Sequence, residues 1–317
     1  DPSVDLQKVA QSVGMNQGVP PRSTCVFCHS RAGGDDNVKH GDISTDMTAT
    51  TKQYDVHMGT DGGNFTCVKC HQVKKDSAGN TLSHGIGGMA FHSIDEGAMQ
   101  VCSDCHGAVT SIHAGTSVES LVQSHSRLAC QVCHIPTIAR KVSTMVDWRW
   151  AEAGLDAAPG SCAPADPAVL PARPTYSKLK GCFTWKNNVR PTLRYFDGKW
   201  NRVMLNVNDQ YASLPVDLAS PTATYQTPGA MIYPFKRMTG NQPADSANKT
   251  VLVPNLFGNA TTDPDAYWVS FDWGRALASG TFYTGQPYSG TYEFVDTVML
   301  LKVDHEVAPA EQAYGKD

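Results

Sequence analysis

The feature that most constrains this chain is the sequence Cys-x-x-Cys-His, which occurs four times in its first 134 residues. Two thiols at this spacing can add across the two vinyl groups of a haem, and the adjacent histidine can bind the iron as its proximal ligand. Paired cysteines also bind zinc, but zinc does not require a histidine directly after every second cysteine. The repeated motif therefore predicts four covalently bound c-type haems. The attachment residues are Cys25, Cys28, Cys67, Cys70, Cys102, Cys105, Cys130 and Cys133, and the proximal ligands are His29, His71, His106 and His134.

The spacing of the motifs also limits what this part of the chain can fold into. They begin at Cys25, Cys67, Cys102 and Cys130, so four large apolar cofactors share a segment too short to build an ordinary polypeptide core. We therefore expect a multihaem cytochrome c fold with little regular secondary structure, in which short helices and loops surround a haem stack. The 27 glycines and 19 prolines agree with a high loop content.

The character of the sequence changes after Trp150, because residues 157–174 are rich in alanine and proline and no further haem motif follows. We expect a tetrahaem-binding region over residues 1–150 and a haem-free, irregular α+β region over residues 151–317, packed on the haem core. The two remaining cysteines, Cys162 and Cys182, are expected to form a disulfide, with two buried free thiols as the alternative.

Local patterns predict a few regular elements in the second region. Alternation of apolar and polar residues indicates a strand over Thr291–Val303 and a hairpin over Leu193–Leu205 with an Asp-Gly turn. A short helix is expected within Asp265–Ala278, and Pro309 is expected to open a final turn over Ala308–Ala313.

Charge and hydropathy exclude two classes of partner. The chain has 26 Lys and Arg against 30 Asp and Glu, so its formal net charge is −4 and it lacks the basic excess that binds nucleic acid. No stretch approaches the roughly 18 consecutive apolar residues of a membrane-spanning helix. No signal peptide is recognisable at the N-terminus, and we expect Asp1 to be the mature start.

Seven histidines remain for the second axial position of the irons, where four are expected to be distal ligands. For any single histidine, a surface or satisfied core position is the alternative. His125 is expected on a helix over Ser117–Ala129, where Leu121 and Leu128 share its buried face. His92 is ranked last among the six histidines that lie among the motifs, because only its position in the sequence favours it. The other candidates are His40, His57, His84, His113 and His305, and Met58, Met89 and Met99 are less favoured alternatives.

Several segments resemble the octahaem tetrathionate reductase family. They are Cys25–Asp42 with its Val-Lys-His-Gly-Asp ending, Asp55–Met58, Asn64–Cys67, Ala129–Thr137, Phe183–Asn188, Ile232–Lys236 and Val303–Pro309. The resemblance implies that His305 is a haem ligand, because the family places a ligand histidine in this His-x-Val-Ala-Pro segment. The family's reductase site also has a haem with a lysine as distal ligand; Lys39 and Lys236 stand in matching segments, and neither is assigned to that role.

The family has eight haems, whereas this chain has motifs for four. The expected function depends on this difference in haem number. A four-haem row with both ends uncovered is similar to the extracellular tetrahaem cytochromes that polymerise into conductive filaments. We therefore expect an electron-transfer protein that is not an enzyme, associates head-to-tail with copies of itself, and meets redox partner proteins or extracellular acceptors. The alternatives are a multihaem reductase of nitrite, hydroxylamine or tetrathionate, and a monomeric electron shuttle. The expected location is extracellular, with the periplasm as the alternative.

Overall fold

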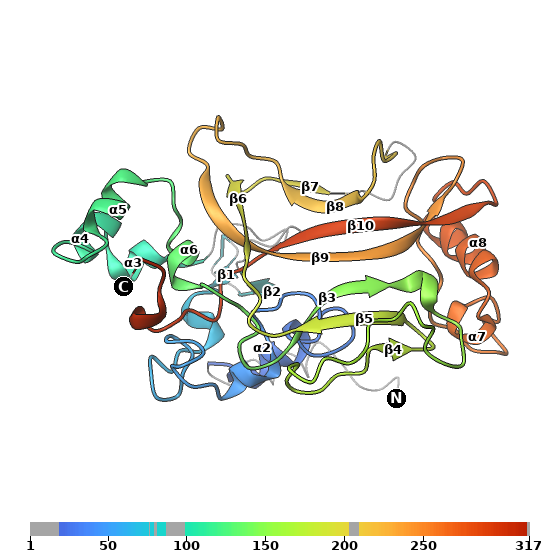
Figure 1. The fold of residues 1–317 in the computed structure, drawn as a ribbon, viewed down its shortest axis with the longest axis horizontal. Coiled ribbons are helices and arrows are strands. Elements are labelled where there is room, and N and C mark those ends of the chain that lie inside the picture. The colour runs from blue at the N-terminus through green and yellow to red at the C-terminus, as the bar shows by residue number, and fades with distance from the viewer. Residues whose placement is uncertain (1–18, 76, 79–80, 87–98, 203–208, 316–317) are drawn as a thin grey trace.

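The computed structural model describes residues 19–75, 77–78, 81–86, 99–202 and 209–315, and its centre is a mixed β-sheet (Figure 1). The strand order along the sheet is β4-β5-β3-β9-β10-β8-β7, and β6 also pairs with β9. A separate antiparallel pair, β1 and β2, lies among the haem motifs. The strands are β1 (Val73–Lys75), β2 (Thr81–Ile86), β3 (Thr144–Arg149), β4 (Tyr176–Ser177), β5 (Gly181–Lys186), β6 (Thr192–Phe196), β7 (Trp200–Arg202), β8 (Val216–Pro221), β9 (Met231–Asp245) and β10 (Tyr292–Lys302).

Strands β9 and β10 form the longest pairing of the sheet. Every residue of β10 has a partner in β9, from Tyr292 opposite Asp245 to Lys302 opposite Phe235. Val295, Leu300 and Leu301 of β10 are buried, as expected for a strand whose apolar residues face a core. The strand predicted over residues 291–303 is thus confirmed.

The predicted hairpin over residues 193–205 is wrong. β6 pairs with β9, and β7 pairs with β8, so the two strands on either side of Asp197 and Gly198 do not pair with each other. Strand β9 is long enough to pair with β3 and β6 at different positions along one side and with β10 on the other. Phe196 packs against Phe235 of β9 at 5.7 Å between ring centres, which favours this pairing.

The helices are short; α3, α4, α5 and α6 gather at the end of the sheet opposite α7 and α8, whereas α2 lies nearer the middle of the molecule (Figure 1). In place of the single helix expected within residues 265–278, the structure has two. The first ends just before Phe271, which takes a left-handed conformation, and the second begins after Asp272, whose side chain accepts a hydrogen bond from the backbone N–H of Arg275. The described helices are α2 (Arg22–His29), α3 (Cys102–His106), α4 (Val109–Ile112), α5 (Glu119–Ser124), α6 (Cys130–His134), α7 (Tyr267–Ser270) and α8 (Trp273–Thr284), with 3-10 turns η1 (Thr45–Thr48), η2 (Cys67–Lys69), η3 (Trp150–Glu152) and η4 (Ala310–Gln312).

The expected fold class is confirmed: short helices and irregular loops surround the motifs, and a mixed sheet dominates the rest. The turn η4 confirms the final turn predicted after Pro309. Strand β3 precedes residue 150 and pairs with β5 and β9 beyond it, so the sheet spans the predicted boundary. The division at that residue stays a prediction.

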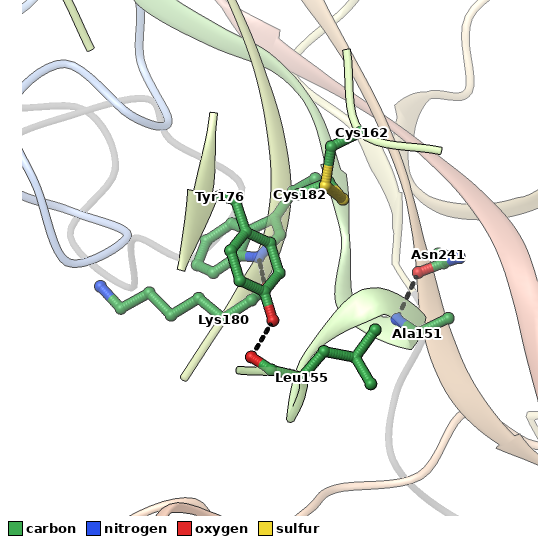
Figure 2. The surroundings of a disulfide bond; sticks show 8 residues. Ala151, Leu155, Cys162, Tyr176, Lys180, Cys182 and Asn241 are labelled. Atoms are coloured by element: carbon green, nitrogen blue, oxygen red, sulfur yellow. Dashed lines mark hydrogen bonds between the residues drawn. A yellow bond between two sulfur atoms is a disulfide. The ribbon is translucent and has the colours of Figure 1, made fainter. Parts of the chain in front are cut away.

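A disulfide joins the alanine- and proline-rich loop to the sheet. Cys162 is bonded to Cys182 of β5, as predicted, and Figure 2 shows the bond beside two other links. The hydroxyl of Tyr176 donates to the carbonyl of Leu155 at 2.6 Å, and the backbone N–H of Ala151 donates to Asn241 Oδ1 at 3.0 Å. The loop is therefore fixed against the strands on which it lies.

The described residues include no helix that is both long enough and apolar enough to cross a membrane.

Candidate haem-binding site

The four motifs share a compact local geometry. The first ends α2, the third and fourth form α3 and α6, and the second begins with the turn η2. Residues three or four positions apart lie on the same side of a helical turn. Each turn therefore presents its two thiols and its histidine in one direction, as attachment to a single haem requires. All eight motif cysteines are free of disulfides.

The attachment thiols of neighbouring motifs lie close together. Burial raises the pKa of the Cys67 thiol to about 11, and the neighbouring Cys25 of the first motif contributes to this rise. Burial also raises the pKa of Cys70, with a smaller contribution from Cys105 of the third motif. A hydrogen bond links Cys102 to Cys130 and lowers the pKa of Cys130 to about 6. The thiols of successive motifs are thus near enough to influence one another electrostatically.

Three motif histidines lie opposite histidines that the sequence analysis named as distal candidates. The ring centres are separated by 5.9 Å between His57 and His106, 6.0 Å between His71 and His305, and 6.2 Å between His113 and His134. Two metal–nitrogen bonds of about 2 Å, plus roughly 1 Å from each nitrogen to its ring centre, give about 6 Å. Each of the three spacings would therefore leave room for one iron between the two imidazoles.

Local hydrogen bonds orient two of these candidates. Asp55 is buried, and its Oδ1 accepts from the backbone N–H groups of His57 at 2.9 Å and Met58 at 2.8 Å. His113 follows α4, and its Nδ1 lies 2.7 Å from the carbonyl oxygen of Val109. A carbonyl can only accept, so Nδ1 carries the proton and Nε2 keeps its lone pair for a metal.

His305 is held by a carboxylate from the first haem segment. Asp42 Oδ2 lies 3.1 Å from His305 Nδ1 and accepts from the backbone N–H groups of Asp304 and His305, each at 2.9 Å. Asp42 is buried. Sequence reasoning missed this residue, since nothing local relates the segment around Asp42 to a histidine near the end of the chain.

Arg140 fixes the backbone on the other side of His305. Its side chain is 9% exposed, and its guanidinium donates to the carboxylate and the carbonyl oxygen of Glu306 and to the carbonyl oxygens of Gln53 and Tyr54. These bonds join the segment after the fourth motif to the loop before His57 and to the segment carrying His305. Arg140 is a second residue that the sequence analysis did not single out.

The remaining candidates are placed differently. His125 is exposed rather than buried, which corrects the expectation of a helix over residues 117–129: α5 ends at Ser124, and His125 caps it. The side chain bends back, with Nδ1 3.1 Å from the carbonyl oxygen of Leu121. His40 is partly buried beside Asp42. His84 lies in β2, but its side chain is outside the described residues, as are His92 and Met89.

Lys236, one of the two lysines in the family-like segments, is fully buried. Its Nζ donates to Val38 O at 2.6 Å, Lys39 O at 2.8 Å and Thr144 Oγ1 at 2.6 Å. Burial lowers its pKa well below the usual range, but three acceptors fit the three donors of an ammonium group. Lys236 therefore has a structural role, because its ammonium group links β9 to the segment of Val38 and Lys39 and to Thr144 of β3. Lys39, the other lysine, is exposed.

The donor set fits covalently attached haem better than a bare metal ion. Among the described residues, no three or more His, Cys, Asp or Glu side chains lie together in a way that could hold such an ion. A structural zinc site needs four ligands around one point. Paired thiols beside imidazoles spaced for one iron are instead the arrangement that a haem requires.

Comparison with known proteins gives two findings. The family described as "Cytochrome c bacterial" matches residues 145–315, a range that includes His305 and none of the four motifs. The crystal structure of an octahaem cytochrome c from Shewanella oneidensis superimposes with a TM-score of 0.73 at 31% identity, and the match covers 98% of this chain. This chain spans 65% of the length of that protein. None of the curated proteins matches.

The structural match corrects one expectation. We expected a protein that is not an enzyme, but the chain shares its fold, at 31% identity, with an octahaem cytochrome c. Octahaem cytochromes include the reductase family whose segments the sequence resembles. The exclusion of enzymatic activity is therefore wrong.

Proposed function

The chain belongs to the bacterial cytochrome c family, and we propose that it transfers electrons through four covalently bound c-type haems. Bound haem supplies a reversible one-electron couple at each iron. The chain supplies thioether attachment through the motif cysteines and one proximal imidazole at each motif. Covalent haem attachment takes place outside the cytoplasm, so an exported protein follows from the same proposal.

Three second ligands are proposed from the spacing of the rings. His305 serves the haem at His71, His57 serves the haem at His106, and His113 serves the haem at His134. These three spacings are the single observation that carries the proposal. An iron with two imidazoles is saturated, which favours electron exchange over substrate binding at these centres. For the haem at His29, the remaining candidates are His40, His84, His92 and His125, and the side chains of His84 and His92 lie outside the described residues.

The contacts between motifs support a continuous path. Thiols of the first and second, second and third, and third and fourth motifs are neighbours. Haems attached through them are held close to one another, and electrons are expected to pass along the row in sequence order.

Haem content tests this proposal directly. Mass spectrometry of the denatured protein should show the added mass of four haems. Replacing both cysteines of one motif, as in Cys102→Ala with Cys105→Ala, should remove the mass of a single haem. A chain that carries fewer than four haems, or that keeps four after this double substitution, would contradict it.

A multihaem reductase is the second candidate, and the fold shared with an octahaem cytochrome c favours it. Such activity needs one iron with a weak or exchangeable second ligand. The test is reduction of nitrite, hydroxylamine or tetrathionate by the dithionite-reduced protein. Turnover at enzymatic rates would support the candidate, and reoxidation no faster than that of free haem would exclude it.

Head-to-tail association remains a proposal about assembly. A contact between two different surface patches does not close on itself and generates an open filament. Copies of the chain would then extend the row of haems outside the cell towards redox partners or extracellular acceptors. Electron microscopy of native material tests this: filaments are expected, and protein that stays monomeric at high concentration would contradict the proposal.

A further inference from the structure

We propose that Asp42 is a positioning residue that lowers the reduction potential of the haem attached at Cys67 and Cys70, by accepting a hydrogen bond from His305. This inference rests on the proposed function, in which His71 and His305 ligate the same iron. It also predicts which of two haems in the row has the lower reduction potential, and the ligand assignment alone does not give this order.

The geometry directs one carboxylate oxygen at the ligand segment. Asp42 is 1% exposed, and its Oδ2 is shared by His305 Nδ1 and the backbone N–H groups of Asp304 and His305. Oδ1 is buried and has no hydrogen-bond partner among the described residues. All the hydrogen bonds that this carboxylate receives from the described residues therefore come from the segment that carries the imidazole.

The bond also selects the nitrogen that remains for the metal. A carboxylate accepts the Nδ1 proton, so the lone pair of His305 is on Nε2. The ring of His71 lies 6.0 Å from that of His305 between centres, and the two ring planes are within 18° of each other. Carboxylate partners of this kind orient a ligating histidine and increase its basicity.

His113 provides the comparison within the same chain. Its Nδ1 is bonded to the neutral carbonyl of Val109 at 2.7 Å, whereas His305 faces a buried carboxylate. A more basic ligand and a nearby negative charge both stabilise ferric iron relative to ferrous iron. The haem served by His305 should therefore be reduced at a lower potential than the haem served by His113.

Asp42→Asn tests the inference, because it keeps the shape of the side chain and removes its charge. In a spectroelectrochemical titration, one of the four reduction steps should move upward, with its equilibrium constant increased at least tenfold, which is 59 mV for a one-electron couple. Asp304→Asn is the matched control. Asp304 adjoins His305, but its carboxylate is already paired with Lys302 at 2.8 Å, so a shift below threefold is expected.

Two ligand variants identify the steps and keep the test decisive if Asp42→Asn does not fold. Methionine as an axial ligand raises a haem's potential, so His305→Met and His113→Met should each move one step. In the unsubstituted protein, the step assigned through His305 should lie below the step assigned through His113. The reverse order, or a folded Asp42→Asn protein with four unshifted steps, would overturn the inference. Unchanged spectra in both methionine variants would instead contradict the proposed ligation.

Discussion

Arg140 holds Glu306 at two points, with its Nε 3.4 Å from Glu306 Oε2 and a second guanidinium nitrogen 2.9 Å from the Glu306 carbonyl oxygen. Both side chains are nearly inaccessible, at 9% and 4% exposure. Glu306 has a left-handed backbone with φ of 62°, and it directly follows His305. The pair therefore fixes a strained turn next to a proposed ligand.

Removing one partner of this pair should destabilise the protein. Arg140→Met leaves the buried Glu306 side chain and the carbonyl oxygens that Arg140 binds without their donor, and each buried unsatisfied group costs about 1–3 kcal/mol. Denaturant unfolding should show a clearly lower free energy of unfolding, and the spectrum of one haem should acquire high-spin character as His305 is released. A stability loss below about 1 kcal/mol with unchanged spectra would show that Arg140 does not position this segment.

The same carboxyl group predicts a pH dependence. Burial raises the pKa of Glu306 to about 8, with Arg140 opposing the rise, from 4.5 in the unfolded chain. The folded state therefore binds the proton more tightly, and the contribution to stability is complete below pH 4.5 and is lost as pH increases towards 8. Glu306→Gln should flatten this part of the stability profile between these pH values. An identical slope in the variant would assign the dependence to another group.

Lys236 should prove structural rather than a haem ligand. Lys236→Met leaves the acceptors Val38 O, Lys39 O and Thr144 Oγ1 without their donor, and a buried unsatisfied group costs about 1–3 kcal/mol. Thermal unfolding should occur at a lower temperature while the visible and electron paramagnetic resonance spectra of the haems stay unchanged. A new high-spin signal in this variant would show that the lysine ligates iron after all.

The proposed ligands can be separated from a similar histidine that lies outside the pairs. His57→Ala should convert the haem at His106 to a high-spin form, because its second ligand is removed. His125→Ala is the matched control. This histidine also has its Nδ1 near a backbone carbonyl, but it is exposed at the end of α5. Equal high-spin signals from both variants would contradict the assignment.

Features whose chemistry is local in the chain could be predicted from the sequence. The thiols and proximal histidine of each motif are adjacent in the chain, and the Cys162–Cys182 disulfide required no more than the two cysteines left over. Strand β10 was recognisable because its own residues alternate. These predictions needed no knowledge of which distant segments meet.

The remaining features depend on contacts that are remote in sequence. His57 precedes the second motif yet lies opposite His106 of the third, and His71 meets His305 from the far end of the chain. Strand β6 pairs with β9 rather than with its neighbour for the same reason. Asp42 could not be identified as a ligand partner, because its role exists only when the segment carrying His305 packs against it.

The central claim is that paired imidazoles saturate the irons, and electron paramagnetic resonance of the fully oxidised protein tests it most directly. With spins quantified against haem content, the three pairs at 5.9, 6.0 and 6.2 Å predict low-spin ferric signals from at least three haems per chain. High-spin ferric signals from two or more haems per chain would contradict the account.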